Sequence, residues 1–152
     1  MTTQRETLER ALASIKKVHD TVDIGNADPF EWYWTDGKIV HEALRSRQTR
    51  DAFLCRIASE GEQWAALEMV LTGILLAQTN DEEWVVFTAL AVTMYGQGML
   101  GEALILAKRA LSQNPDYGLA SLIKKVLELG MGSEEFIETF RMVATETDAK
   151  VD

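Results

Sequence analysis

Apolar residues recur at steps of three and four along most of this chain, a spacing that predicts helices and not strands. Only two Pro and ten Gly interrupt the 152 residues, and β-rich folds with many tight turns usually need more of both. No segment alternates apolar and polar residues in the way that a half-buried strand does. The chain is therefore predicted to be all-α.

The pattern divides the chain into about seven or eight helices, which we expect to pack as an irregular helical bundle. The first begins at Thr3 and Glu6, a capping box in which each side chain satisfies a free backbone N–H of the other residue. A chain of this length can bury a core without disulfides or metals. The expected helices cover residues 3–22, 39–44, 49–58, 64–78, 84–95, 101–112, 119–129 and 133–143.

These helices are expected to form a single domain over residues 1–148, followed by a disordered tail at 149–152. Within the domain, residues 1–48 would supply N-terminal helices and an aromatic loop, and residues 49–141 the helical core. The last residues, from Thr145 onward, are mostly polar and are expected to fray.

Charge is unevenly placed along the chain. Acidic side chains outnumber Lys and Arg by 24 to 15, which gives a formal charge of −9. Residues 38–56 nevertheless hold five cations and two acids, whereas residues 57–107 hold seven acids and neither Lys nor Arg. Because phosphate backbones are bound by Lys and Arg, we do not expect nucleic acid as a partner. The anionic span suggests an alternative role as an acidic inhibitor or regulator of a host DNA-binding protein, although its acids are sparse for a phosphate mimic.

The single cysteine and the apolar segments bear on the compartment. Cys55 has no partner for an internal disulfide, and the N-terminus lacks the apolar core of a secretory signal. The most apolar segment, residues 64–77, contains Glu68 and is shorter than the ~20 residues of a membrane span. We predict a cytoplasmic protein with no membrane partner. Cys55 itself follows two apolar residues and is expected to pack in the core, with a reactive thiol as the alternative because Arg50 and Arg56 are near in sequence.

One stretch has the spacing of a tetratricopeptide unit, a helical hairpin of about 34 residues. Gly98 would permit the tight turn, Ala103 would let the paired helices approach closely, and Pro115 would end the second helix. One such unit cannot bury its own apolar face, so the other helices must cover it. The matching positions within residues 84–116 are Phe87, Leu90, Ala91, Gly98, Ala103, Ala110 and Pro115.

The run GQGMLGEALILAKRALSQNPDYGLASLIKKVLELGM, together with RDAFL at residues 50–54, resembles the C-terminal part of a family of uncharacterised proteins. This is the actinobacterial and phage-borne domain of unknown function forty-one ninety-two. The resemblance covers roughly residues 49–141 and departs at Gln97 and Asn114, where the family usually has Asp. The matching residues are Gly98, Ala103, Ala110, Leu111, Pro115, Tyr117, Leu119, Ala120, Leu122, Leu127 and Gly130.

The resemblance implies no activity, because the family has none established. The family's longer N-terminal region looks absent from this chain. Short versions would be expected in phages of actinobacteria, and residues 1–48 would then be a phage-specific addition.

Candidate catalytic and metal-binding residues are few. His19 and His41 have no metal-ligand spacing, so we predict no metal site and no cofactor. Glu68 lies in an apolar stretch, where a buried carboxylate needs a partner. Arg50 or Arg56 could supply a buried ion pair, with a ligand site as the other interpretation of Glu68. An enzyme with an unrecognised site around Glu68 and the two His is a further alternative.

Four aromatic residues in five positions have the strongest claim on interaction, because Trp and Tyr dominate binding hot spots. They could equally seal the core, and both interpretations stay open. With three nearby cations they form the predicted partner-binding residues, which are Phe30, Trp32, Tyr33, Trp34, Lys38, Arg45 and Arg47.

A repeat-type scaffold without a convergent catalytic set indicates a non-enzymatic protein-interaction module. The expected partner is a protein. Four Trp and six Met are many for a small domain, so a homodimer is left open as well.

Overall fold

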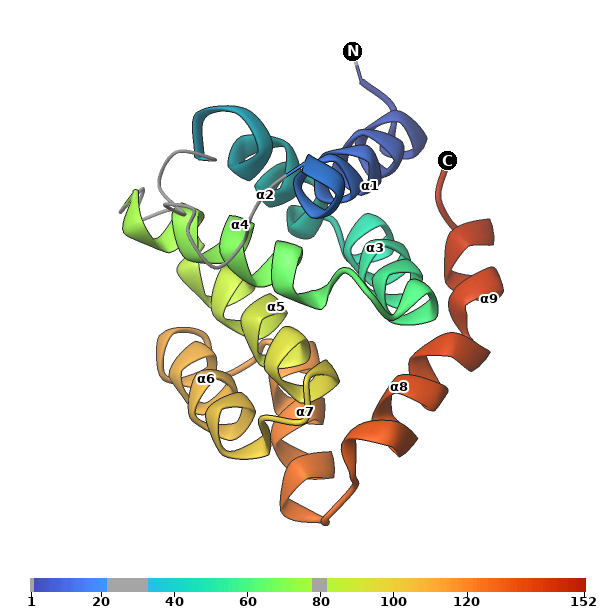
Figure 1. Ribbon diagram of the computed structural model, residues 1–152. Helices are drawn as coiled ribbons and strands as arrows, with labels where there is room; N and C mark the ends of the chain where they lie inside the picture. The colour runs from blue at the N-terminus through green and yellow to red at the C-terminus, as the bar shows by residue number, and fades with distance from the viewer. Residues whose placement is uncertain (1, 22–32, 78–81) are drawn as a thin grey trace.

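The computed structural model describes residues 2–21, 33–77 and 82–152 (Figure 1). These ranges contain nine α-helices and one π-helical turn, and no strand, which confirms the predicted all-α fold. None of the helices in them is long and apolar enough to cross a membrane. The elements are α1 (Gln4–Thr21), η2 (Tyr33–Gly37), α2 (Lys38–Arg45), α3 (Arg47–Glu60), α4 (Trp64–Leu76), α5 (Glu83–Gly96), α6 (Leu100–Gln113), α7 (Gly118–Glu128), α8 (Ser133–Met142) and α9 (Ala144–Ala149).

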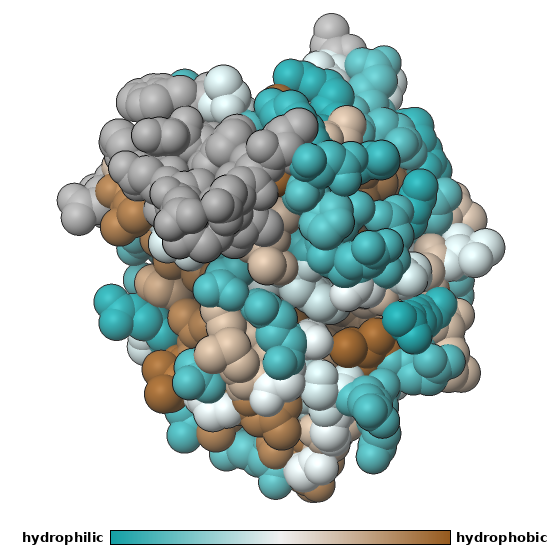
Figure 2. All heavy atoms as spheres, viewed as in Figure 1, coloured by the Kyte–Doolittle hydropathy of each residue, from teal (hydrophilic) through white to brown (hydrophobic). Residues whose placement is uncertain are grey.

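Helices α1 to α5 pack together and enclose most of the hydrophobic core. Figure 1 shows α1 and α2 at the top, α3 to the right of α4, and α6 and α7 below α5. On the face drawn in Figure 2, hydrophilic residues cover α1, and hydrophobic ones gather over α4, α5 and α6. Fully buried core side chains include Leu8, Ile15, Val18, Leu44, Phe53, Ile57, Leu67 and Tyr95.

The π-helical turn η2 continues directly into α2. The backbone of Gly37 is right-handed helical, so this glycine does not break the chain direction. The carboxylate of Asp36 is buried, and Lys17 Nζ of α1 lies 2.9 Å from its Oδ1. The ion pair offsets the cost of burying the carboxylate and ties η2 to α1.

The predicted hairpin is formed by α5 and α6, which lie against each other. Gly98 has a φ of +82°, a left-handed backbone that favours glycine at the turn. Ala103, Ala107 and Ala110 are fully buried, and their small side chains let α6 lie close to its neighbours. Helix α7 then packs against α6, so that the hairpin is covered on a second side.

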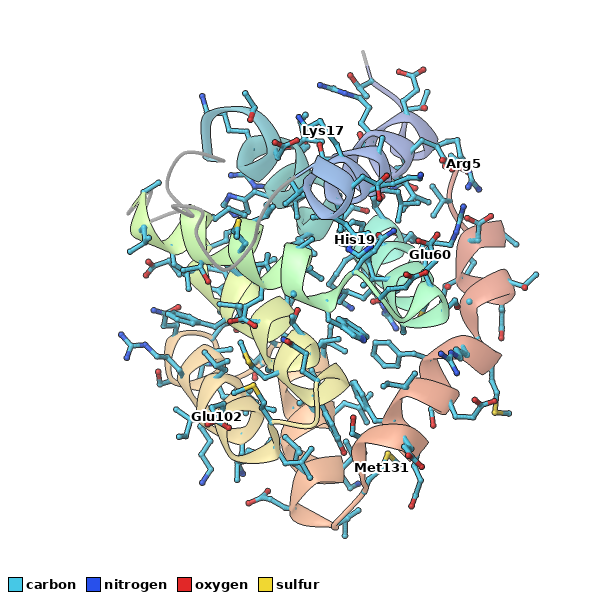
Figure 3. All side chains as sticks on the ribbon, viewed as in Figure 1. Arg5, Lys17, His19, Glu60, Glu102 and Met131 are labelled. Atoms are coloured by element: carbon cyan, nitrogen blue, oxygen red, sulfur yellow. The ribbon has the colours of Figure 1, made fainter. Side chains whose placement is uncertain are left out.

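Helix α8 is attached to the end of α5 through Tyr95. The Tyr95 hydroxyl donates to the carbonyl of Met131, at 2.7 Å, and Ser133 Oγ donates to the carbonyl of Tyr95, at 2.6 Å. The rings of Tyr95 and Phe136 stack with centroids 3.8 Å apart. Figure 3 shows Met131 between α7 and α8, at the bend where the chain turns back toward the N-terminal helices.

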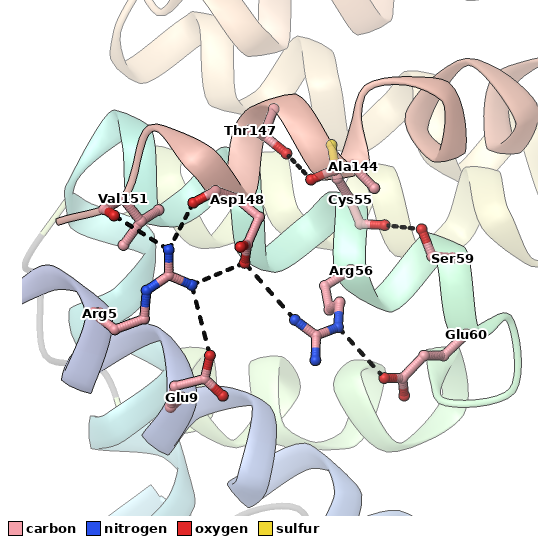
Figure 4. A network of polar contacts seen from close by, with 10 residues as sticks. All are labelled: Arg5, Glu9, Cys55, Arg56, Ser59, Glu60, Ala144, Thr147, Asp148 and Val151. Atoms are coloured by element: carbon pink, nitrogen blue, oxygen red, sulfur yellow. Dashed lines mark hydrogen bonds and ion pairs between the residues drawn. The ribbon is translucent and has the colours of Figure 1, made fainter.

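The last residues do not form the disordered tail that was expected at 149–152. The backbone N–H of Arg5 donates to the carbonyl of Asp152, at 2.6 Å. The Arg5 guanidinium donates to the carboxylate and carbonyl of Asp148, at 2.9 and 2.7 Å (Figure 4). Val151 is only 6% exposed. The buried side chain of Val151 and the cation of Arg5, which lies at the carbonyl end of α9, thus hold this segment in place. Its polar sequence had predicted that it would fray.

The packing of Trp64 on Gly96 predicts a stability difference between two glycines. A Cβ at Gly96 would overlap the buried indole ring of Trp64, whereas a Cβ at Gly101 meets no atom within 4 Å. Gly96→Ala should lower the free energy of unfolding by about 1–3 kcal/mol through overpacking. Gly101→Ala should leave it unchanged or raise it by up to about 1 kcal/mol, because glycine is the poorer helix former.

Urea denaturation of the two variants, followed by circular dichroism, measures this difference. If Gly96→Ala is as stable as Gly101→Ala, the close contact between α4 and the end of α5 is wrong.

Candidate functional site

A groove with a cavity volume of about 640 Å³ opens beside α3. One wall is α3, the second is the start of α7, and the third is the end of α8 with the turn into α9. The residues that line it are Arg45, Arg47, Arg50, Asp51, Leu54, Cys55, Tyr117, Gly118, Leu119, Leu122, Phe140, Val143 and Thr147.

Helix α3 contributes one continuous stripe of side chains to the groove. Arg47, Arg50, Asp51, Leu54 and Cys55 occupy positions i, i+3, i+4, i+7 and i+8, which lie on the same face of a helix. Leu54 and Cys55 are buried, whereas Arg47 is exposed. The stripe therefore runs from a charged end at the start of α3 to an apolar floor about two turns further on.

The second and third walls are apolar. Leu119 and Leu122 come from the first turns of α7, and Leu122 is 53% exposed. Phe140 and Val143 come from the end of α8 and are half-buried. Leu122 and its half-buried apolar neighbours therefore form an apolar surface that a bound molecule can cover.

Arg50 joins α3 to α7 across the groove. Its Nε and Nη2 donate to Asp51 Oδ1, at 2.9 and 2.7 Å, and its Nη1 donates to the Tyr117 hydroxyl, at 2.8 Å. Burial opposes the charge of Arg50, but Tyr117 and Asp51 outweigh it and raise the pKa of Arg50. Burial also raises the pKa of Tyr117, although Arg50 counteracts this in part. Arg50 is therefore a fixed cation in the side of the groove.

A smaller hollow of about 200 Å³ adjoins the groove. It shares Arg47, Asp51 and Thr147 with the groove and adds Gln48 and Lys150. Four cations thus border the two hollows against one carboxylate, in a chain whose formal charge is −9. The term cationic rim is used below for Arg45, Arg47, Arg50 and Lys150.

Cys55 lies at the groove floor as a buried thiol. Burial raises its pKa to about 11, and this effect outweighs the opposing hydrogen bond with Thr147. The thiol is therefore protonated at neutral pH, as expected for a cysteine that packs in the core. The alternative of a reactive thiolate beside arginines has no support here, because neither Arg50 nor Arg56 is among the causes of the shift.

The structure describes only some of the other predicted partner-binding residues. Phe30 and Trp32 lie outside the described residues, and of Tyr33 and Trp34 only the backbone, in η2, is described. The role of the aromatic cluster as a docking surface therefore stays a prediction, with core packing as the alternative. Arg45 and Arg47 line the groove, whereas Lys38 begins α2 and is not part of the lining.

The predicted buried ion pair of Glu68 is wrong. Glu68 is half-buried and accepts a hydrogen bond from Gln97 Nε2, at 2.8 Å, on the solvent side of α4. Arg50 pairs with Asp51, and Arg56 lies 3.8 Å from both Glu60 and Asp148. Because Glu68 keeps contact with water beside the end of α5, it needs no buried cation.

The two histidines do not join Glu68 in a site. His19 Nε2 lies 4.0 Å from Glu62 Oε2, and His41 is buried in α2. Burial lowers the pKa of His41, and Arg45 lowers it further. No three His, Cys, Asp or Glu side chains of the described ranges gather as metal ligands would. The site imagined around Glu68 and the histidines is thus not assembled.

Several groove residues were not singled out from the sequence. The signal for Asp51 and Leu54 was present, since they share a helix face with Arg47 and Arg50. Tyr117 was noted only as one of the residues that match the family, in the run Pro-x-Tyr-x-Leu-Ala, and no role was predicted for it. Phe140, Val143, Thr147 and Lys150 could not be placed, because they reach the groove only when α8 and α9 fold back toward α3.

The chain matches a known protein family. A family model described as Domain of unknown function (DUF4192) matches residues 1–134. The matched range includes residues 1–48, which the resemblance had left outside, and ends within α8. No curated protein and no solved structure matches the chain.

The burial of Cys55 predicts that its thiol reacts slowly with electrophiles. A pKa about two units above the usual value leaves about 100-fold less thiolate at neutral pH than in the unfolded chain. Reaction of this single cysteine with an uncharged maleimide should therefore be at least about 100-fold slower in the folded protein than in urea. The rate should rise as the pH approaches 11. Equal rates for the folded and unfolded chain at neutral pH would show that the groove floor is not buried as described.

Proposed function

The chain belongs to the family described as Domain of unknown function (DUF4192), and we propose that it acts as a non-enzymatic protein-interaction module. The docking surface is the groove between α3, α7, α8 and α9. The occupant is a short segment of a partner protein.

The main support for this proposal is an apolar groove with a positively charged edge in a chain whose net charge is negative. Buried Leu54 and Cys55 form the floor, Leu119, Leu122 and Phe140 form the sides, and the cationic rim borders them. Apolar surface covered by a ligand contributes about 25 cal/mol per Å². Arg and aromatic side chains around such a surface are typical of binding hot spots.

The walls of the groove are held in place without a ligand, which supports a binding role. The Arg50–Tyr117 hydrogen bond fixes the start of α7 relative to α3, at 2.8 Å. Asp148 fixes α9 to two other helices, through Arg5 at 2.9 Å and Arg56 at 3.8 Å (Figure 4). A preformed groove loses less conformational entropy when it binds, and this favours affinity.

Leu122 provides a direct test, with Leu129 as the matched control. Both are exposed, at 53% and 76%, but only Leu122 lines the groove. A phage-displayed library of random dodecapeptides would be selected on the full chain, and the enriched peptides synthesised. Leu122→Asp should weaken their binding by about ten- to 100-fold, since it removes an apolar contact and places a charge in the groove. Leu129→Asp should leave it unchanged.

Fluorescence polarisation of the labelled peptides measures both effects. The proposal fails if the selection enriches no peptide, or if Leu129→Asp weakens binding as much as Leu122→Asp.

A further inference from the structure

We infer that the bound segment is acidic: two or more carboxylates lie on the cationic rim, and an apolar side chain lies on the groove floor. This inference rests on the proposed function and adds the chemistry of the occupant.

Two of the four cations in the rim keep uncompensated positive charge, whereas Arg45 lies 3.5 Å from Glu42 and Arg50 lies 2.7 Å from Asp51. Arg47 and Lys150 are exposed, and neither forms an ion pair with any residue that the structure describes. The carboxylate in the lining, Asp51, accepts two hydrogen bonds from Arg50 and is thereby committed to it. A carboxylate from a partner would therefore meet unpaired cations at Arg47 and Lys150. Arginine suits such a partner, because its planar fork can bond both oxygens of a carboxylate.

The number of cations distinguishes an acidic peptide from a ligand with one charge. Arg47 and Lys150 come from different elements, α3 and the residue after α9, and both border the smaller hollow. A fatty acid has one carboxylate and can occupy only one part of such an edge. A peptide segment with several Asp or Glu residues can face the whole edge.

A nucleic acid fits less well, because its sugar-phosphate backbone has no apolar side for Leu54, Leu119 and Leu122. Its length would also carry it beyond the rim, over a chain with a formal charge of −9. The attraction at the rim is local, and charges further away than about 10 Å are largely screened at 0.1 M salt.

The geometry of α3 sets the spacing within the bound segment. Leu54 lies seven positions after Arg47, or about 10 Å further along the helix axis. An extended peptide spans that distance in about three residues, and a helical one in about seven. The acidic and apolar side chains of the partner should therefore be separated by one of these two spacings.

Arg47→Glu tests the charge, with Lys108→Glu as a matched control. Both residues are exposed, but Lys108 lies on α6 outside the groove. Arg47 is the first residue of α3, where a glutamate is favoured by the helix dipole, so the variant should fold. Dodecapeptides selected on the unchanged chain should be enriched in Asp and Glu. They should bind Arg47→Glu at least about tenfold more weakly and Lys108→Glu with unchanged affinity.

Two further measurements use the same peptides. Binding should weaken as salt is raised from about 50 mM to about 500 mM, because the rim contacts are partly exposed. A new selection on Arg47→Glu should enrich Asp and Glu less strongly than the selection on the unchanged chain.

The outcomes separate this inference from the proposed function. Peptides that depend on Leu122 but carry no excess of Asp or Glu, or that bind Arg47→Glu as tightly as the unchanged chain, would overturn the inference and leave the interaction module standing. Displacement of the peptides by a short oligothymidylate would also overturn it, since the occupant would then be a nucleic acid. If no peptide is selected, the proposed function itself fails.

Discussion

The hydrogen bonds of Arg50 are the interaction on which the groove depends. The backbones of α3 and α7 scarcely approach each other, so the two walls are connected by a long side chain and not by close packing. Arg50 spans this distance and bonds Asp51 on its own helix and Tyr117 at the start of α7. Helix α5 joins the α5–α6 hairpin to the N-terminal helices by packing on α4 in the core, and Arg50 adds a polar connection between α3 and the start of α7. A hollow remains beside it, bordered by cations and floored by Leu54 and Cys55.

The third wall depends on the return of the chain toward its beginning. Tyr95, at the end of α5, stacks on Phe136 in the first turn of α8 and thereby fixes the start of α8. At the far end, the Asp148 carboxylate lies between Arg5 of α1 and Arg56 of α3 (Figure 4). Val151 is buried beside this ion-pair network. These contacts place Phe140 and Val143 opposite α3, although they lie beyond the range that the family model matches.

The fold could be predicted from the sequence because its signals are local. Apolar spacing and caps gave eight helices that correspond one by one to α1 to α8, and Gly98 located the hairpin turn at its positive φ. Helix α9 was missed because its short polar sequence has no apolar stripe, and it is held by distant residues such as Arg5. Arg45 and Arg47, two of the predicted partner-binding residues, line the groove, whereas Arg50 was assigned to the wrong carboxylate. Its real partners, Asp51 and Tyr117, include a residue 67 positions away that no periodicity could indicate.

The chain has a net charge of −9 and yet borders an apolar groove with cations, and we propose that this groove binds an acidic segment of a partner. Amide hydrogen exchange of the full chain, with and without a selected acidic dodecapeptide, tests this claim most directly. Bound peptide should slow exchange in the first turns of α7, from the end of α8 through α9, and at the start of α3, and should leave α6 unchanged. Slower exchange confined to α6, whose Ile105 is 67% exposed, or to α1 would contradict it.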